Sequence, residues 1–343
     1  MKRSFFGAFA GVLLLISWDV ASAQAPGASQ RIAAAANAFL ATLDSPRREK
    51  VLAAFDDAEQ RTRWSNLPVA MAPRGGISLR EMTPRQRTAA LGLLSSVLSR
   101  AGYEKVMLIM EGDEANKAES RGSRAELFGK DLYFISILGT PSERDPWMLQ
   151  FGGHHLGVNV IIAGERGVLT PTLTGAQPAM FTLNGKTVRP LEGESDKALA
   201  LLNALDENQR DEAILKYRVA DLVLGPGQDG KTIQPEGLKA SSMNARQRAM
   251  LLDVMSEWAG IIHESAAAAR MAELERGIED TWFAWSGPTS AGTGGNITAY
   301  YRIQGPNVVI EYAPQQFGGD PALHIHTMYR DPANDYGKRL VAQ

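Results

Sequence analysis

The sequence predicts an α+β fold built of two pseudo-repeated halves, each a helix pair followed by antiparallel strands. The first observation behind this prediction is a helix-starting motif, in which Thr83, Asp206 or Asn244 lies three residues before a glutamine. In such a capping box each side chain satisfies the other's free backbone donor, so each motif marks the start of a helix. The second observation is that the order of segments after Thr83 recurs after Asn244, about 150–160 residues further on.

The N-terminus has the pattern of a secretory signal peptide. Lys2-Arg3 precedes an apolar run over residues 5–18, and Ala21-Ser22-Ala23 then forms a small-residue cleavage site. We expect removal of residues 1–23 and a periplasmic or secreted mature protein; an uncleaved anchor is the alternative. No later apolar run approaches the roughly 18 residues that a membrane helix needs, so we expect no membrane span after signal removal.

Composition excludes several classes of function. The formal net charge is -2 and no basic stripe occurs, so we expect no nucleic-acid partner, because phosphate binding needs clustered Lys and Arg. The chain contains no cysteine, which excludes thiol catalysis and leaves His, carboxylate or Met as metal ligands. The absence of a G-x-S-x-G motif leaves an α/β-hydrolase serine unsupported.

The mature chain is predicted to begin with helices. Residues 24–30 are small and polar, and we expect them to be disordered. Apolar residues at helical spacing predict a helix over 31–43. Ser45-Pro46 then predicts a second helix to about Gln60, because proline is favoured at the first helical position.

Helical and strand segments follow the three capping boxes in order. The segments with a 3.6-residue apolar period are 89–98, 213–219 and 250–258. The expected strands are 132–135, 147–151 and 156–162 in the first half, and 281–284, 299–302 and 308–312 in the second. We therefore expect one domain over 31–340, made of pseudo-repeats at about 80–190 and 200–340. The alternative is that helix-then-strand order recurs by chance.

Four of the five histidines form two clusters, His154-His155 and His324-Ile-His326. Alternate side chains of a strand share a face, so His324 and His326 are expected to point the same way and to offer one metal ion two imidazoles. The alternative is a pair of polar side chains on a half-exposed strand.

His154 and His155 would point to opposite faces of a regular strand. His155 shares its face with Gly157, which leaves room above the sheet, whereas His154 shares its face with Leu156 and the core. We therefore predict His155 as a metal ligand, and His154 as a buried, hydrogen-bonded histidine or a further residue of the metal site. A bulge at Gly152-Gly153 would reverse this assignment.

Three imidazoles from His155, His324 and His326 would match catalytic zinc sites, which keep an open position for water. The expected cofactor is a divalent metal ion, with Zn, Cu and Fe all compatible with the donor set. Glu311 is the predicted fourth ligand or general base. Arg330 is the predicted partner of a substrate carboxylate, with an ion pair to a nearby aspartate as the alternative.

Two motifs resemble a known bacterial family. They are Q-F-G-G-H-H-L-G-V-N (residues 150–159), with Leu169-Thr170-Pro171, and H-I-H-T-M-Y-R-D-P-A-N-D-Y-G (residues 324–337). The chain resembles, over about 31–340, the family catalogued as domain of unknown function 3500. The resemblance implies one co-folding unit with both histidine clusters as family features, and it implies no activity and no catalytic roles.

The function expected from these patterns is that of an exported, histidine-ligated metalloprotein, with hydrolysis of a small or polymeric substrate by metal-activated water as its reaction. Two alternatives stay open. The first is a periplasmic binding or assembly protein without catalysis, and the second is a structural protein whose histidines are hydrogen-bonded core residues.

Overall fold

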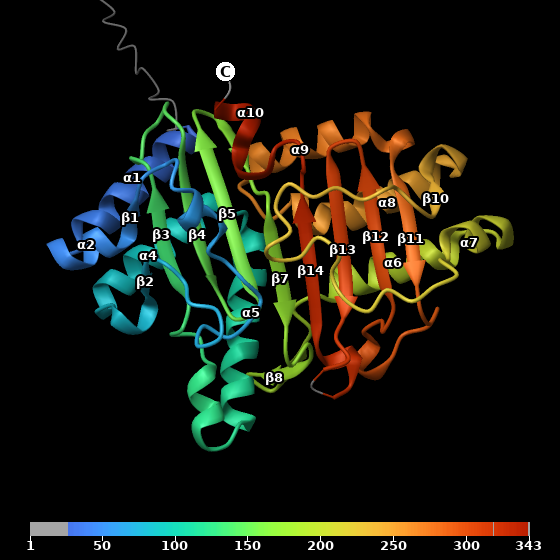
Figure 1. The fold of residues 1–343 in the computed structure, drawn as a ribbon, viewed down its shortest axis with the longest axis horizontal. Coiled ribbons are helices and arrows are strands. Elements are labelled where there is room, and N and C mark those ends of the chain that lie inside the picture. Colours follow the sequence, from blue (N-terminus) through green and yellow to red (C-terminus); the bar gives the residue numbers. More distant parts are fainter. Residues whose placement is uncertain (1–26, 318, 342–343) are drawn as a thin grey trace, which may run out of the picture.

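A large, mostly antiparallel sheet runs through the molecule (Figure 1). The computed structural model describes residues 27–317 and 319–341. The strands of the main sheet are β1 (Leu52–Ala53), β2 (Ile77–Ser78), β3 (Phe134–Leu138), β4 (Trp147–Gly153), β5 (Leu156–Ala163), β6 (Arg166–Val168), β7 (Thr172–Ala176), β10 (Leu238–Lys239), β11 (Trp282–Ser286), β12 (Tyr300–Gly305), β13 (Val308–Pro314) and β14 (Ile325–Arg330). A separate hairpin pairs β8 (Phe181–Leu183) with β9 (Lys186–Val188).

The strand order brings the two parts of the chain together at the centre of the sheet. That order is β1-β3-β4-β5-β7-β14-β13-β12-β11-β10, with β2 beside β3 and β6 beside β5. Strands β7 and β14 pair antiparallel in the middle, where Thr174 lies opposite Thr327 and their hydroxyl oxygens are 2.6 Å apart. This pairing joins the strands of residues 134–176 to those of residues 282–330.

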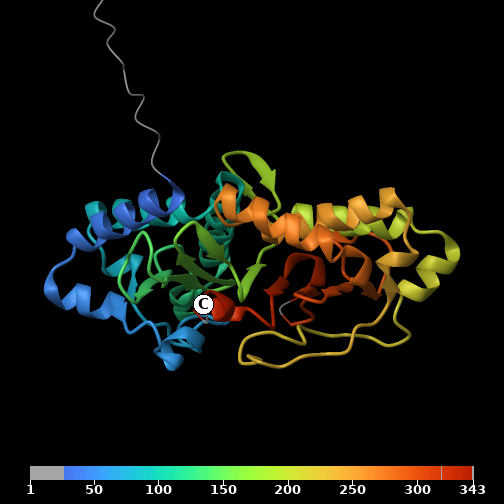
Figure 2. The ribbon, with the colours of Figure 1, turned by 90° about the horizontal axis from the view of Figure 1, so that it is seen from above.

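The longer helices cover one face of the sheet, and long connections together with two short helices cover the other. The α-helices are α1 (Ala28–Ala41), α2 (Ser45–Val51), α3 (Ala58–Thr62), α4 (Pro84–Val97), α5 (Arg100–Glu119), α6 (Glu192–Ala204), α7 (Glu207–Ala213), α8 (Ala245–Ala259), α9 (Glu264–Arg276) and α10 (Lys338–Val341). Figure 2 shows α1, α8 and α9 on one side of the sheet and the connection over residues 214–237 on the other, where the short helices α3 and α10 also lie. Among residues 27–317 and 319–341, no helix is both long and apolar enough to cross a membrane.

Short 3-10 helices lie between these elements. They are η1 (Leu79–Glu81), η2 (Gly122–Leu127), η3 (Ala240–Ser242), η4 (Ile278–Asp280), η5 (Thr293–Gly295), η6 (Pro321–Leu323) and η7 (Asp335–Gly337). Together with the large antiparallel sheet, the helices confirm the predicted α+β class.

All three predicted capping boxes are present and begin helices. The pairs are Thr83 with Gln86 at α4, Asp206 with Gln209 at α7, and Asn244 with Gln247 at α8. Each of these glutamines also bonds to the end of another helix, and the Nε2 of Gln209 donates to the carbonyl of Ser242 at the end of η3 (2.8 Å). The Nε2 of Gln86 donates to the carbonyl of Thr42 (3.0 Å), and that of Gln247 donates to the carbonyl of Ala204 (2.9 Å). The same residue therefore starts one helix and holds the end of another.

Two predicted helices are shorter than expected. The helix expected to reach Gln60 stops at Val51, because residues 52–53 pair with β3 and Asp57 caps the new helix α3 through the backbone N–H of Gln60 (2.9 Å). The helical segment expected over 213–219 is also wrong. Helix α7 ends at Ala213, and Ile214 instead forms a parallel bridge with Trp285. In both places a distant strand offers the backbone a pairing that replaces the helix.

The N-terminal helix begins earlier than predicted. Helix α1 starts at Ala28, so residues 28–30 of the segment expected to be disordered are helical. Ala28 and Ser29 are buried, and the Ser29 hydroxyl donates to the Glu165 carboxylate (2.5 Å), which accounts for the extra turn. The predicted signal peptide, residues 1–23, lies outside the described residues, as do residues 24–26.

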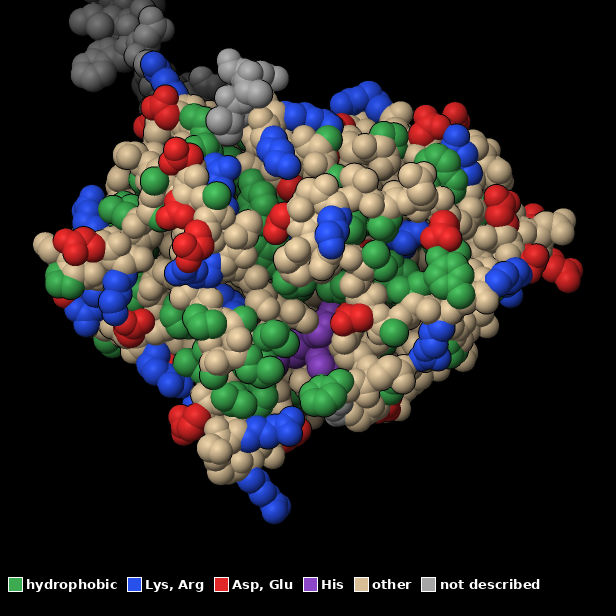
Figure 3. All heavy atoms as spheres, viewed as in Figure 1, with side chains coloured by type: hydrophobic (Ala, Val, Ile, Leu, Met, Phe, Trp, Pro, Cys, Tyr) green, Lys and Arg blue, Asp and Glu red, His purple; other side chains and the backbone are tan. Residues whose placement is uncertain are grey.

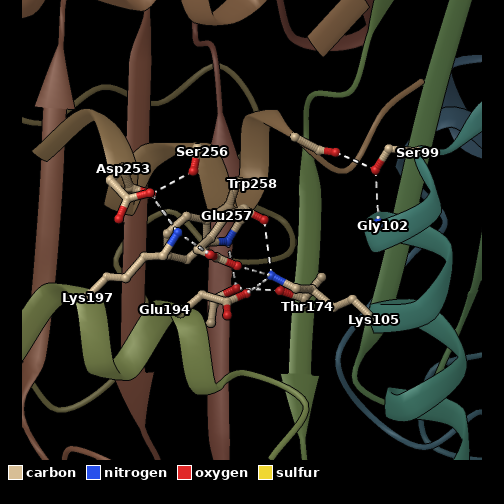
Figure 4. A network of polar contacts seen from close by, with 12 residues as sticks. Ser99, Gly102, Lys105, Thr174, Glu194, Lys197, Asp253, Ser256, Glu257 and Trp258 are labelled. Atoms are coloured by element: carbon tan, nitrogen blue, oxygen red, sulfur yellow. Dashed lines mark hydrogen bonds and ion pairs between the residues drawn. The ribbon is translucent and has the colours of Figure 1, made fainter. Parts of the chain in front are cut away.

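A buried ionic network connects the helices behind β7 and β14 (Figure 4). The ammonium of Lys105 on α5 lies 2.6 Å from a carboxylate oxygen of Glu194 on α6 and 2.8 Å from one of Glu257 on α8. Beside it, the indole N–H of Trp258 donates to the Thr327 hydroxyl on β14 (2.9 Å). These contacts tie α5 to α6 and α8, and α8 to β14.

Candidate metal centre

His154 and His155 form the two-residue turn between β4 and β5, where Gly153 pairs with Leu156. The prediction that they lie on a regular strand is therefore wrong, and alternation of faces does not apply to them. His155 has a φ of 60°, a left-handed conformation that few non-glycine residues adopt. The tight turn, not the pleat of a strand, decides where the two rings point.

Three contacts to the backbone fix this turn. The Tyr133 hydroxyl donates to the carbonyl of His154 (2.7 Å). The backbone N–H of His155 donates to the carbonyl of Asn66 (3.2 Å), and the guanidinium of Arg74 donates to the carbonyl of Gly153 (2.8 Å). Asn66 and Arg74 belong to the connection over residues 54–76, so this connection holds the histidine turn against the sheet.

The second histidine pair lies at the start of β14. His324 immediately precedes the strand and His326 lies within it, and their Nε2 atoms are 3.2 Å apart, so the two rings share a face as predicted. The Nε2 atom of His155 lies 3.0 Å from that of His324. One ligand nitrogen from each of the three buried histidines falls within 4.8 Å of the other two. The three side chains could therefore hold a metal ion.

A hydrogen bond of His324 decides which of its two ring nitrogens is unprotonated and has a lone pair available for a metal ion. Its Nδ1 lies 2.8 Å from the carbonyl oxygen of Phe317, which can only accept, so Nδ1 carries the proton. A neutral His324 then presents an unprotonated Nε2 to both His155 and His326. One ring nitrogen has a single in-plane lone pair and cannot accept two good hydrogen bonds. A cation between the rings would instead use a lone pair from each of them.

The distances suit such a cation. Zn–N bonds of about 2.0–2.1 Å in a tetrahedral site place the nitrogens roughly 3.3 Å apart. The observed Nε2 separations of 3.0 and 3.2 Å lie close to this value. The third pair, His155 and His326, lies within 4.8 Å and would have to come closer for all three nitrogens to bind one tetrahedral ion.

Burial keeps the three imidazoles neutral, the protonation state that metal binding needs. It lowers the pKa of His155 well below its usual value, with a further contribution from the neighbouring histidines. Burial also lowers the pKa of His324 to about 4. The pKa of His326 is lowered by burial as well, although Asp221 opposes this shift.

Among the described residues, the ring of His154 forms a hydrogen bond with a carboxylate and none with the three converging histidines. Its Nδ1 lies 2.6 Å from a carboxylate oxygen of Asp113 on α5, and its ring packs against Phe128, with centroids 5.0 Å apart. The ring centroid of His154 is also 3.7 Å from that of His155. His154 therefore supports His155 from behind, and it is not one of the three histidines that converge.

Two further contacts orient His326. Its Nδ1 lies 3.8 Å from a carboxylate oxygen of Asp221 and 3.2 Å from the side-chain nitrogen of Asn66. Sequence reasoning missed both residues, together with Asp113 and the carbonyl of Phe317. Asn66, Asp113 and Asp221 lie far in the chain from the histidines they contact. The Phe317 carbonyl lies only seven residues before His324, but a backbone carbonyl has no sequence motif that could indicate it.

The structure does not bring Glu311 to the histidines. Its carboxylate accepts hydrogen bonds from the backbone N–H groups of Val223 and Leu224 (2.7 and 2.8 Å) and from the Tyr300 hydroxyl (2.7 Å). This buried carboxylate therefore anchors the connection over residues 214–237 to β13. The sequence placed Glu311 on the correct face of the strand. It did not predict the backbone N–H groups that bind the carboxylate and keep it from acting as a ligand or general base.

Arg330 has a similar structural role. Its guanidinium donates to the carbonyls of Leu224 (2.7 Å) and Gly225 (3.0 Å). It also forms ion pairs with Asp229 (3.0 Å) and Asp335 (2.8 Å). The alternative of an ion pair, here with Asp335, thus describes Arg330 better than a contact with a substrate carboxylate.

The three histidines lie at the base of a pocket of about 420 Å³. Figure 3 shows purple histidine side chains in a hollow, with hydrophobic side chains to its left and below it and an acidic side chain at its upper right. The pocket is also lined by Leu67, Met71, Phe128 and Phe317. A metal ion held by the histidines would therefore face a mostly apolar pocket that is open to the surface.

Comparison with known proteins adds one finding. Searches among curated proteins and among solved structures gave no match. The profile of a family described as "Protein of unknown function (DUF3500)" matches residues 26–338, nearly the whole chain, including both histidine clusters. The chain therefore belongs to the DUF3500 family.

Proposed function

We propose that this protein is a metalloprotein in which His155, His324 and His326 bind one divalent transition-metal ion. The observation that carries the proposal is the convergence of three buried imidazoles, with Nε2 atoms 3.0 and 3.2 Å apart around His324. Three imidazole nitrogens suit Zn(II), Cu(II) or Fe(II), and the donor set does not select among them.

We propose further that the metal acts as a hydrolytic catalyst. Three protein ligands leave a tetrahedral ion one position for water, and a zinc ion lowers the pKa of that water to about 7. The pocket above the histidines supports this reading, because it gives a substrate access to the open position. Asp221 would orient His326, and the carbonyl of Phe317 would hold the Nδ1 proton of His324.

Metal analysis of protein purified without a polyhistidine tag tests the binding step. We expect about one equivalent of metal per chain, loss of that metal in His324→Ala, and full retention in His263→Ala. His263 is a suitable control because it lies at the start of α9, where its Nδ1 contacts the Ser265 hydroxyl. A wild-type protein that neither contains metal nor takes up zinc would show the proposal to be wrong.

A second function, as a non-catalytic binding or assembly protein with structural histidines, is favoured by one observation. His324 and His326 already have protein partners in Phe317 and Asn66, as hydrogen-bonded core histidines do. On this reading His324→Ala would lower stability, and the wild type would hold no metal. Circular dichroism and thermal unfolding of the same variants therefore separate the two functions.

Export belongs to the proposal as well. It is supported by the basic start, the apolar run and the Ala21-Ser22-Ala23 site of the N-terminus. We expect Gln24 to be the first residue of the mature protein in the periplasm or medium. An intact-mass measurement that still includes residues 1–23 would contradict this.

We also propose that the two halves of the chain are diverged copies of one unit. Support comes from the order of elements, because two helices followed by three strands occur twice. The first set is α4, α5, β3, β4 and β5, and the second is α8, α9, β11, β12 and β13. The two-residue turn at His154-His155 also has a counterpart at Pro306-Asn307, between the paired residues Gly305 and Val308. Superposition of residues 80–163 on 241–313 tests this, and unrelated positions of the strands around Gly153 and Gly305 would refute it.

A further inference from the structure

Exposed apolar side chains gather at the rim of the histidine pocket. Five large hydrophobic side chains of the described residues are exposed, and three of them line this pocket: Leu67 (41%), Met71 (65%) and Phe317 (86%). Single exposed hydrophobic residues are ordinary, but a cluster around a concave site marks a place where an apolar group binds. The pocket volume of about 420 Å³ lies in the usual range for small-molecule sites, roughly 300–1,000 Å³.

One arginine side chain of the pocket forms no ion pair with the described residues. Apart from histidines, its charged lining residues are Arg124 and Asp221. The Asp221 carboxylate accepts hydrogen bonds from the side chain of Gln315 (2.8 Å) and from the backbone N–H of Leu222 (2.7 Å). Within residues 27–317 and 319–341, Arg124 forms neither an ion pair nor a hydrogen bond through its side chain, and it is exposed. It is therefore free to bind an anion.

Arg124 stands at the border of a second, polar pocket. This neighbouring space of about 350 Å³ shares Arg124, Gln177 and His324 with the first. It is also lined by Arg121 and by two carboxylates, Glu119 and Asp320. The lining of this second pocket therefore combines two guanidiniums with two carboxylates, and Arg124 offers an anionic group a cation at the border of both spaces.

We propose that the histidine pocket binds an amphipathic monocarboxylate. Its apolar acyl or aryl body would pack against Leu67, Met71 and Phe317, and its carboxylate would face the guanidinium of Arg124. Since His324 lines both spaces, such a molecule would lie beside one of the three converging histidines. The inference rests on the proposed function for the role of this molecule as a substrate, but its binding can be measured without a metal.

Calorimetric titration with octanoate, octanol and octylamine tests the assignment on metal-stripped and metal-loaded protein. We expect octanoate to bind most tightly in both forms. Arg124→Gln should weaken octanoate about threefold to fivefold and bring it to the level of octanol, because an exposed contact between opposite charges is lost. The control Arg246→Gln removes the same charge from an exposed position that lines none of these pockets, and it should change nothing.

The apolar contacts are tested with a matched pair of exposed residues. Met71→Gln should weaken the binding of octanoate and octanol alike. Val223 is an exposed apolar residue outside the pocket, and Val223→Gln should leave the binding of both unchanged.

The assignment is overturned if octanol or octylamine binds as tightly as octanoate, if Arg124→Gln has no effect, or if no probe binds. Metal-dependent octanoate binding that is insensitive to Arg124→Gln would also overturn it, by showing that the carboxylate ligates the metal. Arg124-dependent binding by a protein that neither contains metal nor takes up zinc would instead refute the metal proposal alone.

Discussion

Gly175 lies directly opposite His326 in the pairing of β7 with β14, and the ring of His155 occupies the space beside this glycine. A Cβ atom at Gly175 would lie 3.2 Å from Cδ2 and 3.3 Å from Cβ of His155, and 2.8 Å from the carbonyl oxygen of Ile325. These distances are too short for an ordinary contact. The convergence of His155 with the histidines of β14 therefore depends on the missing side chain at position 175.

Gly175→Ala should displace His155 and weaken metal binding at least about tenfold. Because the new methyl group also meets backbone, we expect a loss of about 1–3 kcal/mol in the free energy of unfolding. Competition with a chelator measures the first effect, and urea denaturation of metal-free protein measures the second. Gly92→Ala on α4 is the control, since a Cβ there meets nothing within 4 Å and alanine is favoured in a helix. Wild-type metal affinity in Gly175→Ala would show that packing at this glycine does not position His155.

Asp221→Asn should lower metal affinity by about tenfold without removing the metal. The carboxylate lies 3.8 Å from Nδ1 of His326, and a carboxylate in this position increases the basicity of a metal-binding imidazole. The same chelator competition measures the change. Asp280→Asn, an exposed residue paired with Lys239, provides the control. Equal affinities of the two variants would mean that Asp221 does not act on His326.

The sequence predicted the three converging histidines, but the geometry that brings them together differs from the prediction. His155 was assigned from the alternation of strand faces, whereas it lies in a turn at a φ of 60°. Glu311 was predicted as a site residue because it lies on the face opposite the apolar residues of its strand, and Arg330 because it shares a face with His324 and His326. Both are instead saturated by the connection over residues 214–237, which carries no periodic signal.

Local signals predicted the fold better than long-range ones did. Each capping box places a side chain beside a backbone donor three residues away, so Thr83 and Asn244 marked helix starts without knowledge of the rest of the fold. The ends of α2 and α7 were missed because pairing with β3 and Trp285 decides them. Those partners are distant in the chain, and periodicity within a segment cannot reveal them.

Asp331 gives the stability of the fold a specific pH dependence. Burial raises its pKa from 3.8 to about 6, although Arg270 and Arg339 oppose this shift. The folded state then holds the proton more tightly than the unfolded chain. Its stabilising contribution is fully present below a pH of about 3.8 and is lost as the pH rises through about 6, with an upper limit of about 3 kcal/mol.

Asp331→Asn should therefore remove this dependence, because asparagine does not titrate. Between about pH 4 and pH 7, we expect the wild type to lose about 2–3 kcal/mol relative to the variant in urea denaturation. The exposed Asp211 provides the control, and Asp211→Asn should follow the wild type at every pH. Parallel curves for wild type and Asp331→Asn would show that Asp331 is ionised in the folded protein throughout this range.

Lys105→Met should destabilise the protein more than any other change of a lysine in its network. The Glu194 carboxylate is fully buried, and one of its oxygens has no hydrogen-bond partner among the described residues, so Lys105 is the cation that compensates it. Removing one partner of a buried pair typically costs about 3–5 kcal/mol in the free energy of unfolding, which urea denaturation would measure here. The double variant with Glu194→Gln should recover part of this loss, because the buried negative charge is then gone.

Lys197→Met is the control, since Lys197 is about one-third exposed and its pairs with Asp253 and Glu257 are worth about 1 kcal/mol at most. Equal losses for the two lysine variants would mean that burial of Glu194, and hence the contact of α5 with α6, is not maintained by Lys105.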